Sequence, residues 1–288
     1  MLFSLVSRHN KNFFRDRLVV FFSLLTVVIV IALYIIFLQK MQVDAISQSM
    51  PVTTELKLLV NEWMVAGLLA IMPVTTTLAL FGIYVKDVET KVSADFLATT
   101  LPRTTILISY LISSLIIGFV LTVFGYVACT LFLLSAGGEL VGFMTLVKVL
   151  AVILLGVTVS AMFNLLIVTF VKTQNAFSTV STLIGTVIGF LCGVYVPLGV
   201  LPSAVQSFIH FFPISHTAVL LRQILMEDSL ETVFAGNEEA MQSYMEEFGV
   251  VYKVGETVVT QSMSVLFMIA SIIVLALIAA LNYKRKNK

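Results

Sequence analysis

The run from Thr173 to Leu221 contains 49 residues and not one Lys, Arg, Asp or Glu. About 20 helical residues cross a bilayer core, so the run is too long for a single transmembrane helix. Its first part, Thr173 to Val196, has the length and composition of one span, with Ser, Thr and Gly scattered among large apolar residues. The use of the remaining residues decides the topology of the whole protein.

The second part of the run changes character. Pro197, Pro202 and Pro213 break the helical pattern, and polar side chains that lipid cannot satisfy lie among them: Ser203, Gln206, Ser207, His210, Ser215, His216 and Thr217. Non-helical backbone persists at membrane depth only where protein or water covers it. We therefore predict that residues 199–221 form a re-entrant hairpin that enters and leaves on one side, with Arg222 marking the return to the outer surface.

The rest of the chain indicates a polytopic membrane protein, because 59% of its residues are hydrophobic and only 11% are charged. Five further charge-free stretches are long enough to span, at about 18–38, 64–85, 106–134, 149–171 and 262–281. Together with the span in the long run, they predict an all-α fold. It would have six transmembrane helices in a single transmembrane domain over residues 1–288.

The distribution of Lys and Arg favours this topology. With six spans and a cytoplasmic N-terminus, twelve of the 17 cations lie inside and five outside, against ten and seven if the hairpin crossed fully. The five outside are Lys40, Lys57, Lys148, Arg222 and Lys253. The sequence therefore predicts a multi-pass protein of the cell membrane with both termini in the cytoplasm.

Residues 1–17 alternate apolar side chains with Arg8, Lys11, Arg15 and Arg17. This pattern suits a helix that lies in the inner interface before the chain enters the membrane. A simple basic flank that orients the first span is the alternative. Both interpretations place the segment at the cytoplasmic surface.

The loop over residues 86–105 is the main cytoplasmic connection between spans. From Lys86 to Thr100 it has no Pro or Gly, it places charged and apolar residues at helical spacing, and Pro102 ends the pattern. We predict a short amphipathic helix here. It would either float at the interface or seat its apolar ridge in a groove of a cytoplasmic protein.

The segment over residues 222–260 is predicted to lie outside, and it is acidic. Its helical pattern turns one set of apolar residues inward: Phe234, Met241, Tyr244, Met245 and Phe248. It is interpreted as a small cap with a solvated acidic face, and binding of a cationic ligand is the alternative. The first outer loop, residues 39–63, is a candidate to pack against it.

No catalytic site is predicted, because the spans contain no cluster of chemically competent side chains. His210 and His216 lie on different helical faces with Pro213 between them, so no metal site is predicted either. Cys129 and Cys192 both fall within predicted spans and are interpreted as small packing residues.

The spans also hold no acidic residue for an ion-coupled relay and show no internal repeat. No Gly-Lys dipeptide occurs, so the chain lacks a phosphate loop, and any ATPase would be a separate subunit. The net charge of +1 averages a basic inner face and an acidic outer segment, and it gives no indication of nucleic-acid binding.

The order of these parts resembles the membrane subunits of ATP-binding-cassette transporters of the second type, the exporter-type permeases that work beside a separate ATPase. The resemblance rests on three places along the chain. They are Phe14-Arg15-Asp16-Arg17 before the first span, the Leu97-to-Thr104 turn with Pro102 into the third span, and the segment Gly193 to Pro197 through Leu201-Pro202, Phe212-Pro213 and Leu221-Arg222.

The resemblance implies a dimeric export pathway formed with a second copy or a paralogue, surrounded by membrane lipid. The chain itself would carry no cofactor, and ATP and Mg would bind the partner ATPase. The loop after the second span would sit in a cleft of that ATPase. The residues assigned to coupling in this way are Lys86, Asp87, Glu89, Lys91, Val92, Asp95, Phe96, Leu97, Pro102 and Arg103.

The same resemblance makes the second and fifth spans the lining of the pathway. Gly185, Gly189 and Gly193 form a ridge that allows close helix approach, with Ser178, Ser181 and Thr182 one to two turns before it. In the second span, Thr75 and Thr76 follow Pro73 and offer hydroxyls to a substrate or to neighbouring carbonyls. For both groups a packing role is the alternative.

The sequence thus favours an ATP-driven exporter of an amphipathic drug, antimicrobial peptide or lipid-like compound, working by alternating access. An ATP-independent channel or carrier is the alternative in a second class. A membrane-anchored assembly or sensor protein is a third.

Overall fold

The computed structural model describes residues 1–34, 36, 39–46, 53–92, 102–255 and 257–286. The described part is almost entirely helical. Its elements are α1 (Leu2–Arg15), α2 (Arg17–Leu33), α3 (Gln39–Ile46), α4 (Thr54–Glu89), α6 (Arg103–Ser135), α7 (Phe143–Val168), α8 (Gln174–Leu191), η2 (Leu198–Val200), α9 (Ser203–His210), α10 (Ser215–Leu225), α11 (Glu227–Val233), α12 (Glu238–Glu247), β1 (Lys253–Val254), β2 (Thr257–Val258) and α13 (Gln261–Lys286).

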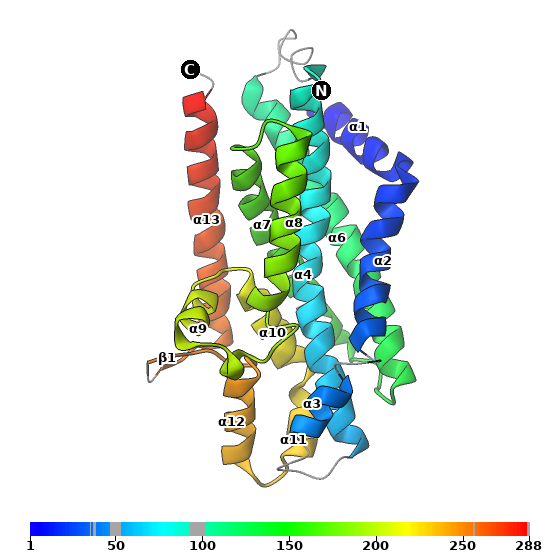
Figure 1. Cartoon of the computed structure of the whole chain (residues 1–288), viewed down its shortest axis with the longest axis vertical. Helices are drawn as coiled ribbons and strands as arrows, with labels where there is room; N and C mark the ends of the chain where they lie inside the picture. The colour runs from blue at the N-terminus through cyan, green and yellow to red at the C-terminus, as the bar shows by residue number, and fades with distance from the viewer. Residues whose placement is uncertain (35, 37–38, 47–52, 93–101, 256, 287–288) are drawn as a thin grey trace.

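The helices α2, α4, α6, α7, α8 and α13 run along the long axis of the molecule (Figure 1). Both termini and α1 lie at one end, called here the N/C end. The helices α3, α11 and α12 and the β1–β2 hairpin lie at the other, called the cap end. The chain is thus sorted into a bundle with two chemically different ends.

Helix α4 is the centre of the bundle. Of its most apolar 18 residues, 89% are buried, against 17% for α13 at the periphery. The contacts of α4 extend to α6, α7, α8, α10 and α11. A displacement of α4 would therefore disturb its packing against all of these helices.

Within the described part of the chain, four helices are long and apolar enough to cross a membrane: Thr54–Glu89, Thr104–Ser135, Phe143–Val168 and Gln261–Tyr283. The α9–α10 pair, bent by 85°, is either a fifth, broken span or a re-entrant loop. Helix α2 has 17 residues, and α8 has 18 with many hydroxyls; both run beside the longer helices (Figure 1). The count of six spans stays a prediction.

The predicted prolines stand at the breaks of the chain. Pro197 precedes η2, Pro202 precedes α9, and Pro213 lies in the bend between α9 and α10. The bend is held by hydrogen bonds: Ser215 Oγ donates to Ile209 O and Phe212 O, both at 2.7 Å. This geometry is compatible with the predicted hairpin.

Arg222, predicted to mark the return of the chain to the outer surface, is buried within the protein. Only 2% of it is exposed, and its guanidinium donates to the carbonyls of Gly249 (3.1 Å), Cys192 (3.0 Å) and Gly193 (2.8 Å). Its guanidinium carbon also lies 4.7 Å from the centre of the Trp63 ring. These oriented carbonyls and the aromatic face replace water around the cation, which allows the chain to fold over it.

The three glycines of the predicted ridge play three different parts. Gly193 has φ +63° and ends α8, so it lies beyond the helix. Gly189 is covered by the ring of Tyr195 from the same chain, and a Cβ on Gly185 would meet nothing within 4 Å. A continuous glycine ridge is therefore wrong, because the helix stops two residues before Gly193.

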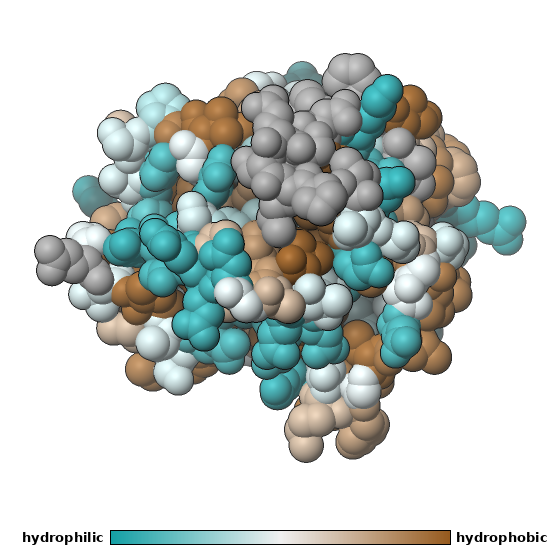
Figure 2. All heavy atoms as spheres, turned by 90° about the horizontal axis from the view of Figure 1, so that it is seen from below, coloured by the Kyte–Doolittle hydropathy of each residue, from teal (hydrophilic) through white to brown (hydrophobic). Residues whose placement is uncertain are grey.

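The acidic cap has the predicted inward face. Phe234, Tyr244 and Phe248 are buried, and Met241 and Met245 pack partly against them. Trp63, the last residue of the predicted first outer loop and part of α4, donates its indole N–H to Phe248 O at 2.7 Å. The acidic side chains of α11 and α12 are mostly exposed, and Figure 2 shows hydrophilic side chains spread over this end of the molecule.

Close packing at the middle of the bundle depends on Gly118 of α6. A Cβ there would lie 2.6 Å from Thr77 Cγ2 and 3.1 Å from Val157 Cγ1. The substitution Gly118→Ala should lower the free energy of unfolding by about 1–3 kcal/mol, because the added methyl group would push α6 away from both α4 and α7. The matched control Gly142→Ala adds the same methyl group where no atom lies within 4 Å, at a φ of −61° that alanine adopts, and it should change the free energy of unfolding by less than about 0.5 kcal/mol.

Thermal unfolding of the purified protein in detergent measures both variants. Equal melting temperatures for Gly118→Ala and Gly142→Ala would contradict this packing.

Candidate functional site

The last turns of α4 at the N/C end carry a buried ion pair. Arg8 of α1 donates to both oxygens of Asp87, at 2.8 Å from Nη1 and 3.3 Å from Nη2. The Tyr110 hydroxyl of α6 donates to Asp87 Oδ2 at 2.6 Å. The exposed fractions of the side chains are 31% for Arg8 and 9% for Asp87. One carboxylate thus joins α1, α4 and α6.

His9 extends this junction. Its ring stacks on Tyr110 with centroids 3.8 Å apart, and Nε2 lies 3.0 Å from Ser109 Oγ. Arg8 Nη1 lies 3.3 Å from His9 Nδ1. Because a guanidinium only donates, Nδ1 must accept, so the ring is neutral with its proton on Nε2. Burial, with the Arg8 charge as second cause, lowers the pKa of His9 to about 4, which agrees with that tautomer.

Glu89 connects the end of α4 to the start of α8. Its Oε2 accepts the backbone N–H of Gln174 at 3.1 Å, where a negative charge meets the positive end of the α8 dipole. The Gln174 side chain donates to Gly82 O at 2.9 Å. Phe177 packs directly on Gly82, where a Cβ would lie 3.0 Å from its ring. The end of α4 therefore holds three helices: α1, α6 and α8.

The predicted start of the coupling helix at Lys86 is wrong. Lys86, Asp87 and Glu89 belong to α4, which continues until Thr90 N–H bonds Lys86 O and Lys91 adopts φ +63°. The charged residues from Lys86 onward show where α4 leaves apolar surroundings. They do not end the helix, because none of them stops the helical backbone.

The other residues assigned to coupling have different positions. Val92 is partly exposed, Pro102 directly precedes α6, and Arg103 is its first residue. Asp95, Phe96 and Leu97 lie outside the described residues.

Of the residues predicted to line the pathway, some are buried in packed helix contacts and others lie at the surface. Thr76 is buried and donates to Met72 O at 2.7 Å, and a Cβ on Gly118 of α6 would lie 3.7 Å from its hydroxyl. Thr75, one position earlier, is partly exposed. The packing alternative thus holds for Thr76, while Thr75 lies on the open side of α4.

One face of α8 is largely exposed. Ser178, Thr182 and Gly185 are exposed and share one face, and Ser181 is partly buried beside them. Thr182 donates to Ser178 O at 3.0 Å, so this hydroxyl is satisfied within the helix. Small, internally bonded residues of this kind tolerate lipid and also allow another helix to approach closely.

Sequence analysis missed the partners of Asp87. Arg8 counted only as part of a basic flank, and Tyr110 as one residue of an apolar span. The pairing joins positions 79 and 23 residues apart. The one usable signal was an Asp that directly follows two largely apolar turns, which requires a buried donor once the helix is known to continue.

The Arg8–Asp87 pair generates a double-mutant test. Asp87→Asn should lower the free energy of unfolding by about 2 kcal/mol, less than a fully buried pair would give, because Arg8 is partly exposed. In the Asp87→Asn background, Arg8→Gln should lower the free energy of unfolding by less than it does in the wild type, since the two side chains share one interaction.

The exposed pair Lys253–Glu246, at 3.3 Å, is the matched control, and Glu246→Gln should change stability by less than about 0.5 kcal/mol. Thermal unfolding in detergent measures all the variants. Additive effects of Asp87→Asn and Arg8→Gln would contradict a direct coupling.

Among the described residues, no group of three His, Cys, Asp or Glu side chains is arranged to hold a metal ion. No curated protein matches the chain. The family model for the ABC-2 type transporter matches residues 1–226, which is more than three quarters of the sequence. The chain has the apolar spanning helices that such a membrane subunit requires. It therefore belongs to the ABC-2 type transporter family, as the membrane component of an ATP-binding-cassette transporter.

Proposed function

We propose that this chain is the permease subunit of an ATP-driven exporter, which moves an amphipathic drug, antimicrobial peptide or lipid-like compound outward by alternating access. The family is that of the membrane component, and it implies a separate ATPase subunit as partner. ATP and Mg would bind that partner, and this chain would carry no catalytic residue.

The observation that carries the proposal is the junction at the end of α4. The chain leaves α4 at Glu89, directly beside the contacts that bind α1, α6 and α8. A force applied to the following loop by an ATPase would therefore reach three helices at once. Tightly packed elements with discrete arrangements transmit such a displacement better than isolated helices do.

The charge of the two ends supports an orientation. The N/C end carries Arg8, Lys11, Arg15 and Lys86, whereas the cap end carries the exposed carboxylates of α11 and α12. The excess of Lys and Arg favours the cytoplasm for the N/C end. This orientation places the end of α4 where a cytoplasmic ATPase would reach it.

A second permease copy would complete the pathway. The exposed face of α8, with Ser178, Thr182 and Gly185, supports close approach to another helix. Thr75 lies on the open side of α4, the helix that α8 contacts. The pathway would thus lie along α4 and α8, between two copies.

Coupling is tested with the complex purified from its native membrane in gentle detergent. An ATPase should co-purify, and Glu89→Lys should reduce transport per ATP hydrolysed, because it replaces the anion at the α8 N-terminus with a cation. The matched control is Glu238→Lys, the same charge reversal at an exposed position of the cap. It should leave the ratio unchanged.

Glu89 is the better target than Asp87, because reversal at a buried ion pair would damage the fold itself. Absence of any ATPase in several detergents, or an unchanged ratio in Glu89→Lys, would sink this function. An ATP-independent channel or carrier would then be favoured.

The dimer is tested by cysteine cross-linking in membranes. Both native cysteines are buried, so background cross-linking should be low. Thr182→Cys should form a symmetric disulfide-linked dimer under mild oxidation. Ile273→Cys, on the exposed surface of α13, is the control and should remain monomeric. Cross-linking at Ile273→Cys alone would place the interface elsewhere.

A further inference from the structure

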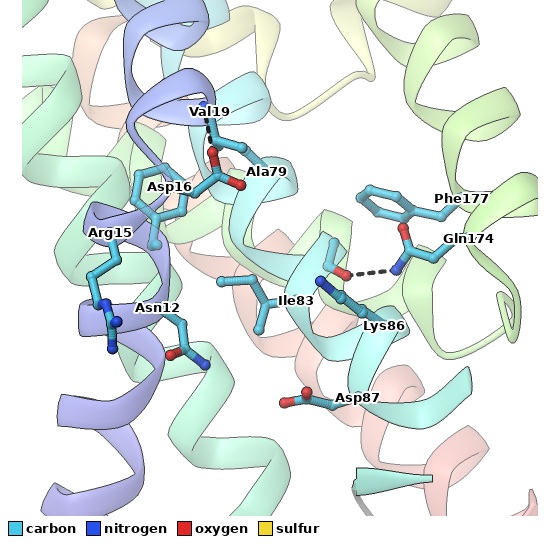
Figure 3. A pocket seen from close by; sticks show the side chains of 12 residues that line it. Asn12, Arg15, Asp16, Val19, Ala79, Ile83, Lys86, Asp87, Gln174 and Phe177 are labelled. Atoms are coloured by element: carbon cyan, nitrogen blue, oxygen red, sulfur yellow. Dashed lines mark hydrogen bonds between the residues drawn. The ribbon is translucent and has the colours of Figure 1, made fainter. Parts of the chain in front are cut away.

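A cavity of about 640 Å³ opens between α4, the turn from α1 to α2, and the start of α8. Figure 3 shows Asn12 and Arg15 of α1 on one side, Gln174 and Phe177 of α8 on the other, and α4 between them. This volume is within the usual range for small-molecule sites, about 300–1,000 Å³. The cavity adjoins the junction at the end of α4 and shares Asp87, Gln174 and Phe177 with it.

The two cations of the lining have no bonding partner in the described part of the chain. Arg15 and Lys86 are both exposed, and neither makes an ion pair or hydrogen bond there through its side chain. The two carboxylates of the lining are engaged: Asp87 by Arg8 and Tyr110, and Asp16 by the N–H of Val19 at 3.2 Å. The hydrogen bond from Val19 leaves the negative charge of Asp16 in place, so the two cations and two carboxylates of the lining sum to zero, and Arg8, which pairs with Asp87, makes the local charge positive.

The neighbouring face of α1 adds to this charge. A shallow hollow next to the cavity shares Asn12 and Arg15 with it and is also lined by Arg8 and Lys11. Grouped cations raise the local concentration of anions. An anionic group approaching along α1 would thus be guided to the mouth of the cavity.

The other residues of the lining are mostly apolar and are arranged along the bundle, with the Asp16 carboxylate beside Val19 and Ala79 (Figure 3). Ala79 precedes Lys86 by two helical turns, about 10 Å along α4. Ala79, Val19 and Phe177 lie together at one end of the cavity, and Arg15, Asn12 and Lys86 lie toward the other (Figure 3). Cations therefore stand toward the N/C end, and the apolar wall extends toward the middle of the bundle.

This order matches a lipid leaflet, in which headgroups lie at the interface and chains lie deeper. We propose that the cavity is a binding site for an amphiphile with an anionic headgroup, such as a phosphate, carboxylate or sulfate, taken from the inner leaflet. Arg15 and Lys86 bind the headgroup, and the wall of Ala79, Val19 and Phe177 covers the first part of the chain. That this amphiphile is the cargo rests on the proposed function.

Binding is tested with radiolabelled dodecyl phosphate and the protein in nanodiscs of neutral phosphatidylcholine. Each Lys or Arg near an anionic lipid contributes roughly a fivefold gain in affinity. The double variant Arg15→Gln/Lys86→Gln should therefore bind about twenty- to thirtyfold more weakly. Lys148→Gln removes an exposed cation from the far end of α7 and should bind like the wild type. Ala79→Phe, which fills the apolar end without changing charge, should also weaken binding.

Two other ligands and the control variant test the ligand class and the position of the site. Dodecyl phosphocholine, with the same chain and no net charge, should bind weakly to every variant. Free inorganic phosphate should not compete; equal competition would show a simple anion site and overturn the amphiphile. An equal loss in Lys148→Gln, or no saturable binding by the wild type, would overturn the site.

The cargo role is tested separately, in liposomes that contain the partner ATPase. Dodecyl phosphate should stimulate ATP hydrolysis with the wild-type permease and not with Arg15→Gln/Lys86→Gln. Equal stimulation of both would overturn the cargo role. If saturable binding persists but no ATPase co-purifies, the site stands and the proposed function fails. If an ATPase co-purifies but dodecyl phosphate does not bind, the site fails alone.

Discussion

The Asp87 carboxylate is buried at the end of α4, the most buried of the four long apolar helices, and an unpaired charge there would destabilise the fold by several kcal/mol. Arg8 and Tyr110 supply its partners, and this requirement fixes α1 and α6 against the end of α4. Glu89 then sets the start of α8 on the same helix. The position of the connecting loop, and the transmission proposed for it, depend on this small set of contacts.

Nearer the cap end, Arg222 is a buried cation, whereas Asp87 is a buried anion. Arg222 is held by three backbone carbonyls and the Trp63 ring instead of a carboxylate. Those carbonyls belong to the end of α8 and to the segment after α12, so a single side chain ties α10, α8, α4 and the cap together. Two charged groups therefore organise the two ends of a mostly apolar bundle. Membrane depth makes both costly to leave unsatisfied.

Sequence patterns predicted the helices well and their ends less well. The apolar runs placed α6, α7 and α13 close to their observed positions, whereas α4 begins at Thr54, ten residues before the predicted start at residue 64 and within the predicted first outer loop. The end of α4 was set too early at Lys86, because charge reports a change of surroundings and only backbone geometry at Lys91 stops the helix. The glycine ridge failed for a related reason: Gly193 adopts φ +63° and lies past the end of α8. Helix ends depend on local backbone conformation that a hydropathy pattern does not contain.

The sequence by itself determined that the chain is a mainly helical, multi-pass membrane protein, and that it resembles the family to which it belongs. Composition and the spacing of Lys, Arg and Pro carry that information directly, because lipid imposes the same length and polarity rules on every span. Only the tertiary structure decided that Asp87 faces Arg8, that Arg222 is buried, and that Arg15 and Lys86 share one cavity. Those pairings join residues far apart in the chain, and their geometry exists only after the helices have packed.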